Sequence, residues 1–179
     1  MKTKITALIV IVFVLIAGAI LWYTKNAPAP SVKTASSPLP ADYKNGTYNI
    51  NGTDVALANG YAETEAAPGS ASKLVTQYFG NEATADLDGD GLPDTAFLLT
   101  QSGGGSGTFY YVAAALKTPN GYKGTNAVFL GDRIAPQATE IQNGEIIVNY
   151  ADRKPGEPMT ARPSVGVSKY LRVENGTLR

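Results

Sequence analysis

Six Asn-Gly pairs punctuate the chain from residue 45 onward, and most are separated by short apolar runs. Asn-Gly suits the two left-handed positions of a tight turn, so between apolar runs it is a strong hairpin signal. The clearest hairpin predicted by this pattern joins 138–142 to 145–151 through Asn143-Gly144. The full set of predicted strands is 47–50, 53–58, 94–101, 107–117, 125–130, 138–142, 145–151 and 165–173.

Two of these segments are apolar on both faces, namely 96–99 (AFLL) and 109–116 (FYYVAAAL). Strands of this kind need cover on both sides, so we expect them at the centre of the sheet. One short helix is predicted at 71–79, with Ser70 as its N-cap and Gly80 at its C-terminal end. The predicted fold class is therefore α+β, predominantly antiparallel β-sheet with about one short helix. An all-β sandwich is the alternative.

Residues 5–23 are almost wholly apolar and follow two lysines. As a helix they would span roughly 28 Å, close to the hydrocarbon thickness of a bilayer. The pattern predicts a transmembrane signal anchor, with 1–4 as a cytoplasmic tail and the body periplasmic or extracellular. A signal peptide that is cleaved to release a secreted body is the alternative. Residues 24–41 contain four prolines and predict a semi-extended tether ahead of an exported β-rich domain, 42–179.

The chain has no cysteine and no histidine. Disulfides, thiolate chemistry and imidazole-based catalysis or metal binding are therefore excluded. The formal net charge is zero, but all 15 acidic residues lie in 42–179, together with 11 of the 15 basic residues. A faintly acidic body lacks the basic stripe that nucleic-acid binding uses. The composition therefore argues against a nucleic-acid partner.

Carboxylates alternate along one nine-residue segment, DLDGDGLPD at 86–94. Two unit charges about 4 Å apart repel by roughly 4 kcal/mol at an effective dielectric near 20, so such a cluster favours a hard cation. The spacing is that of a calcium loop, in which Gly91 permits the sharp turn. The predicted Ca²⁺ ligands are the side chains of Asp86, Asp88, Asp90 and Asp94 and the main-chain carbonyl of Leu92.

An EF-hand would carry a bidentate Glu at position 12 of this loop, followed by a helix. This chain has Phe97 there and continues into an apolar strand, which excludes the EF-hand. The run ADLDGDGLPDTAFLL instead resembles the calcium loops of FG-GAP and VCBS-type repeats, in which the loop leads into a strand. Those families use many copies and this chain has one, so their adhesive function is not implied.

The body as a whole resembles a group of small, uncharacterised exported bacterial proteins. The segments that carry this resemblance, besides the loop, are GGGSGTFYYVAAAL, FLGDRIAPQ and NYADRKPGEPM. It covers most of 45–172 and implies an exported protein with one calcium loop, without implying an activity.

Two further features allow a functional interpretation beside a structural one. Gly103–Gly107 is glycine-rich and can form an anion-binding nest or a flexible hairpin connection. Asp132-Arg133 and Asp152-Arg153 follow strand ends, and Glu140 and Glu157 complete a set of acids from which a hydrolase could draw a pair. Loop ion pairs and turn caps are the structural alternative.

The sequence therefore favours a membrane-anchored, calcium-stabilised extracytoplasmic domain that binds or scaffolds without catalysis. Its partners would be the membrane, through the N-terminal helix, and a surface protein or glycan. One alternative is a carboxylate-based hydrolase of envelope polymer. The other is an inhibitor or accessory subunit that inserts the glycine loop into another exported protein.

Overall fold

Strands dominate the computed structural model, which describes residues 38–179. The predicted tail, the predicted transmembrane segment and residues 24–37 of the predicted tether lie outside the described residues. A 3-10 helix, η1 (Tyr43–Asn45), precedes the strands. These are β1 (Thr47–Ile50), β2 (Thr53–Ala56), β3 (Tyr61–Glu65), β4 (Lys73–Ala85), β5 (Asp94–Ser102), β6 (Phe109–Thr118), β7 (Gly121–Gly124), β8 (Asn126–Asp132), β9 (Ala135–Gln142), β10 (Glu145–Asp152), β11 (Val165–Glu174) and β12 (Thr177–Leu178).

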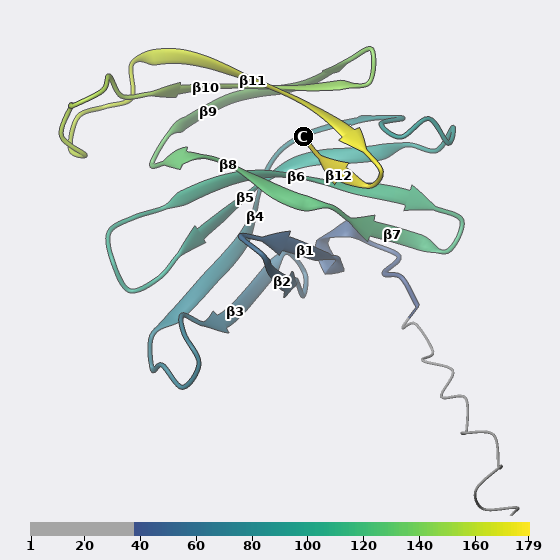
Figure 1. Cartoon of the computed structure of the whole chain (residues 1–179), viewed down its shortest axis with the longest axis horizontal. Coiled ribbons are helices and arrows are strands. Elements are labelled where there is room, and N and C mark those ends of the chain that lie inside the picture. Colours follow the sequence, from purple (N-terminus) through teal and green to yellow (C-terminus); the bar gives the residue numbers. More distant parts are fainter. Residues whose placement is uncertain (1–37) are drawn as a thin grey trace, which may run out of the picture. The chain divides into compact units, whose positions relative to one another are not determined.

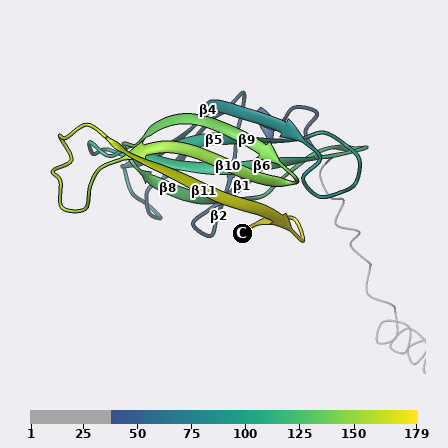
Figure 2. The same ribbon diagram turned by 90° about the horizontal axis from the view of Figure 1, so that it is seen from above.

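The strands form two sheets. The larger sheet has the order β2-β1-β8-β6-β5-β4-β3, with β7 also paired to β6, and the smaller has the order β12-β11-β10-β9. Pairing is antiparallel throughout the described strands except between β1 and β8. Seen from above, the strand axes of the small sheet are roughly aligned with those of β4, β5 and β6 (Figure 2). The predicted predominance of antiparallel sheet is therefore confirmed.

Strands β5 and β6 lie at the centre, with β9, β10 and β11 on one side and β1, β2 and β3 on the other (Figure 1). Alternate side chains of the two central strands enter different cores. Toward the small sheet, Leu98 and Val112 join a buried cluster with Ile146 and Val148 of β10. Side chains at 96–99 are completely buried, as the doubly apolar pattern predicts.

The second core lies on the opposite face of β5 and β6. Phe97 and Tyr111 pack there against Tyr48, Ile50 and Val55 from the first two strands. The rings of Tyr48 and Phe97 meet edge to face, with centroids 5.2 Å apart. The larger sheet therefore supplies both the middle layer and the cover of one of its own faces.

Four of the Asn-Gly pairs form two-residue turns. One of them, Asn59-Gly60, closes the isolated bridge between Ala58 and Tyr61, and the other three join consecutive strands. Asn51, Asn143 and Asn175 have φ near +52°, and the glycine after each is also left-handed. These turns join β1 to β2, β9 to β10 and β11 to β12. The predicted hairpin at Asn143-Gly144 is confirmed, with Gln142 paired to Glu145. The sequence does not predict strands β3, β4, β7 and β12.

The predicted helix at 71–79 is wrong, because these residues enter the 13-residue strand β4. Val75 and Thr76 are β-branched and pair with β3 on one side and β5 on the other. The hydroxyl of Ser70 does accept a backbone N–H, from Ser72, but in a turn. Gly80 has φ +99° and lies at a β-bulge within the strand, not at a helix end. Residues 38–179 contain no α-helix, and the two packed sheets fit the all-β alternative.

The described chain begins beside β7, as Figure 1 shows. The carbonyl oxygen of Pro40 accepts the N–H of Tyr122 at 2.8 Å. A Cβ on Gly121 would lie 2.6 Å from that same oxygen, so this approach needs a glycine. The last residues of the predicted tether are therefore held against the end of β6 and β7. Residues 38–179 include no helix long and apolar enough to cross a membrane.

Candidate metal centre

The acidic segment 86–94 forms the connection from β4 to β5. Asp86, Asp88 and Asp90 each accept hydrogen bonds from backbone N–H groups farther along the loop. Asp86 accepts from Gly89 at 2.8 Å and from Gly91 at 2.9 Å, one bond on each carboxylate oxygen. Both glycines have φ near +84°, a conformation that costs other residues more. The loop shape is therefore encoded by its own Asp-Gly pattern.

Asp94 ties this loop to the protein interior. It is completely buried, and its two carboxylate oxygens accept from different segments. Oδ2 accepts the N–H of Leu87 at 2.8 Å, and Oδ1 accepts the N–H of Lys117 in β6 at 2.7 Å. Leu87 itself belongs to the core between the sheets. Burial raises the pKa of Asp94, and the neighbouring carboxylates of Asp88 and Asp90 raise it further.

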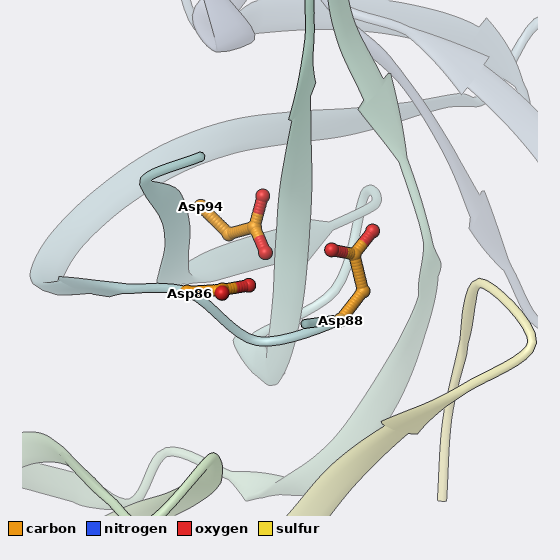
Figure 3. A group of neighbouring side chains, drawn as sticks. All are labelled: Asp86, Asp88 and Asp94. Atoms are coloured by element: carbon orange, nitrogen blue, oxygen red, sulfur yellow. The ribbon is translucent and has the colours of Figure 1, made fainter. Parts of the chain in front are cut away.

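Three of the predicted ligands converge. Asp86, Asp88 and Asp94 each offer a carboxylate oxygen, and these oxygens lie within 4.8 Å of one another. In Figure 3 the three side chains point into a common space, Asp86 and Asp94 from one side and Asp88 from the facing side. Oxygens so placed, with two of the side chains exposed to solvent, could hold a metal ion.

The other two predicted ligands lie in the same loop. Asp90 is outside the group of three, and its Oδ1 accepts the N–H of Leu92 at 2.8 Å. A role for Asp90 or for the carbonyl of Leu92 in metal binding stays a prediction. Phe97 is completely buried in β5, so the loop leads into a core strand, as expected from the absence of an EF-hand helix.

The Asp-Arg pairs form a structural corner where the turn before β6 meets β8 and the end of β10. Asp132 Oδ1 accepts the N–H of Thr108 at 2.9 Å, and Asp132 pairs with Arg133 at 2.9 Å. The Arg133 guanidinium lowers the pKa of Asp132. Arg153 donates to the backbone carbonyls of Asp132, Arg133 and Ala161. Its role in this structure is to fix main-chain segments.

The acids considered for hydrolysis all form hydrogen bonds with residues close in sequence or with residues of this corner. Each carboxylate accepts at least one hydrogen bond from the protein. The donors are Thr108 and Arg133 to Asp132, Gln142 to Glu140, the N–H of Arg153 to Asp152, and the N–H of Lys154 to Glu157. This pattern matches the structural alternative of loop ion pairs and turn caps.

Sequence reasoning missed a hollow at the opposite end of β5 and β6. Its lining includes Asn51, Gln101 and Phe129, which are far apart along the chain. In the sequence, Asn51 belongs to an Asn-Gly turn and Gln101 carries no signal of a site. The one local signal was the density of aromatic residues in FYY at 109–111.

Comparisons with known proteins give no identification. The chain matches no protein-family model, and neither curated proteins nor solved structures give a match.

Proposed function

We propose that this protein is a Ca²⁺-stabilised β-domain that binds a ligand outside the cytoplasm and carries out no catalysis. The observation that supports this most is the placement of Asp94. Asp94 is one of three convergent carboxylates. Its two backbone hydrogen bonds connect this group to Leu87 in the core and to β6. An ion held by this group would brace the connection between β4, β5 and β6.

Calcium fits the loop better than other ions. All the candidate donors are oxygens, which suit hard cations. Magnesium demands a tight octahedron at about 2.0–2.1 Å and keeps several waters, whereas calcium accepts irregular sets of 6–8 oxygens. The exposed side of the loop, at Asp86 and Asp88, leaves room for water to complete such a set.

A structural role for the ion follows from how the carboxylates are used. Both oxygens of Asp94 and both of Asp86 already accept backbone N–H groups, which holds them in place. The ion would neutralise the repulsion that remains among these charges. Stability supplied in this way depends on free calcium, and extracellular modules bind it at roughly 10⁻⁴–10⁻³ M.

Display outside the cytoplasm is part of the proposal and is supported by the sequence. The apolar segment 5–23 and the proline-rich stretch after it are the features of an anchor and a tether. The described chain starts at Pro38, beside the end of β6 that carries the calcium loop. Release as a secreted domain after signal cleavage is the alternative.

Thermal unfolding of the full chain in detergent tests the calcium site. At free Ca²⁺ 10–100 times the dissociation constant, binding adds roughly 1.4–2.7 kcal/mol, which raises Tm by about 4–8 °C over the value in chelator. Asp88→Ala removes one exposed member of the group and should abolish most of this response. Asp54→Ala is the matched control, because Asp54 is an exposed aspartate outside the loop.

Equal melting points with calcium and with chelator in the unmodified protein would overturn the calcium site. A response that persists unchanged in Asp88→Ala would place the ion elsewhere. Magnesium at the same concentration should give a smaller rise in Tm, and a larger one would overturn the assignment to calcium.

A further inference from the structure

The hollow at the far end of β5 and β6 has the dimensions of a small-ligand site. Its volume is about 440 Å³, within the roughly 300–1,000 Å³ that is usual for such sites. The side chains that line it carry no formal charge: Asn51, Leu74, Gln101, Phe109, Tyr111 and Phe129. An ion would find no charged partner among them, so the lining favours an uncharged ligand.

One wall of the hollow is aromatic. Phe129 is 50% exposed and Phe109 is 38% exposed, although neighbouring strand positions bury their apolar side chains. Their ring centroids are 6.4 Å apart, and Tyr111 lies against Phe129 at 5.4 Å. Exposed aromatic groups of this kind mark binding surfaces, because they offer large, rigid apolar faces at little entropic cost.

Amide groups lie beside these rings. Gln101 is only 8% exposed, and its Nε2 donates to the hydroxyl of Thr76 at 3.2 Å. Asn51 Nδ2 donates to the Tyr111 hydroxyl at 3.0 Å. Each amide has two N–H donors and an acceptor oxygen, so each of these bonds leaves further hydrogen-bonding capacity. Both residues also line an adjoining hollow of about 160 Å³.

The aromatic wall is held by the corner built around Asp132. Thr108, next to Phe109, donates its N–H to Asp132 and accepts the N–H of Arg133. A Cβ on Gly107 would lie 3.0 Å from the Phe109 ring, so the glycine lets the ring lie close to the turn. A wall fixed in this way would lose little freedom on binding, which favours affinity.

We propose that this hollow binds a neutral saccharide, with a sugar face against Phe109 and Phe129 and hydroxyl groups bonded to Asn51 and Gln101. Sugars combine apolar C–H faces with many neutral hydroxyls, which is the combination that the lining offers. A proline-rich peptide also suits aromatic grooves, but its prolines present carbonyl acceptors and no N–H donors, whereas sugar hydroxyls can both donate to and accept from the two amides. The site lies at the end of β6 opposite Pro40.

This inference rests on the binding role proposed above, but it is independent of calcium. Saturation-transfer NMR on the full chain, in a phosphocholine detergent without sugar headgroups, tests it with four probes. They are cellotriose and N-acetylglucosamine trisaccharide as neutral sugars, galacturonic acid trisaccharide as a charged sugar, and a proline-rich peptide. We expect saturable binding of at least one neutral trisaccharide, in preference to the charged sugar and the peptide.

Three variants locate the site. Phe129→Ala should weaken binding roughly tenfold, since it removes a half-exposed ring that is not itself a member of either buried core. Asn51→Gly keeps a residue suited to φ +52° but removes the amide, and should weaken binding roughly fivefold. Tyr170→Ala is the control, because Tyr170 is a 58% exposed aromatic on β11 of the other sheet, and binding should be unchanged.

Each other outcome would overturn the inference. Binding of the peptide alone would identify a peptide site, and preference for the charged sugar would contradict the uncharged lining. Neutral-sugar binding that survives Phe129→Ala would place the site elsewhere. Absence of binding by every probe, in protein whose melting still responds to calcium, would reject the saccharide site and leave the calcium proposal standing.

Discussion

The two ends of the β5–β6 pair differ in how the sequence builds a candidate site. At one end, nine consecutive residues bring together Asp86, Asp88 and Asp94, whose carboxylates are held largely by hydrogen bonds within the loop. At the other end, a turn and four strands contribute side chains to an uncharged hollow. The first site is local and charged, whereas the second exists only after the sheet has formed. Substitutions at the two ends should therefore differ in their effects on the protein.

The largest effect on stability is expected at the calcium-loop end. Asp94→Ala removes the acceptor of two backbone N–H groups, those of Leu87 and Lys117, in a completely buried position. An unsatisfied buried group costs about 1–3 kcal/mol, so the free energy of unfolding should fall by roughly 3 kcal/mol or more. Urea unfolding in chelator measures this without the contribution of calcium. A loss under about 0.5 kcal/mol would show that Asp94 does not join the loop to β6.

A smaller effect is expected where the glycine-rich connection meets the hollow. A Cβ on Gly103 would lie 2.6 Å from Leu74 Cδ2 and 3.1 Å from the carbonyl oxygen of Lys73. Gly103→Ala should therefore destabilise by about 1–2 kcal/mol, as overpacking does. Gly105→Ala is the matched control, since its nearest neighbour would be 3.9 Å away. Equal urea midpoints for the two variants would contradict the close packing of this connection on β4.

The smallest effect concerns pH and the corner that supports the aromatic wall. Arg133 lowers the pKa of Asp132, so the ionised carboxylate stabilises the folded state. Such a contribution is present above the unfolded pKa, about 3.9, and is lost as pH falls through the lower folded pKa. Asp132→Asn should therefore be less stable than the unmodified protein at pH 6, and the difference should shrink below about pH 4. Urea unfolding across this range checks it. A difference that grows on acidification would contradict the sign.

Sequence patterning predicts much of this fold because its signals are local. Asn143-Gly144 specifies a turn by its own backbone preference, and the doubly apolar run at 96–99 identifies a strand buried on both faces. The prediction fails at 71–79, where the same apolar residues satisfy a helical period. Pairing of β4 with β3 and β5 decides that segment, and such pairing is not visible from residues 71–79 alone.

The two candidate sites also differ in whether their signals are local in the sequence. Asp86, Asp88 and Asp94 can be named from spacing, because a nine-residue loop has few ways to direct alternate carboxylates inward. The residues that line the hollow cannot be identified from their spacing in the sequence. Asn51 and Tyr111 are 60 residues apart, and their hydrogen bond follows from the order in which β1, β8 and β6 pair.

Calcium binding by the 86–94 loop can be followed residue by residue in a calcium titration monitored through backbone amide NMR resonances. We expect saturable shifts at free Ca²⁺ of roughly 10⁻⁴–10⁻³ M, largest for the amides bonded to the candidate ligands: Leu87, Gly89, Gly91 and Lys117. Phe129, at the other end, should not shift. Resonances of those four amides that stay fixed up to about 10 mM Ca²⁺, well above that range, would contradict calcium binding by this loop.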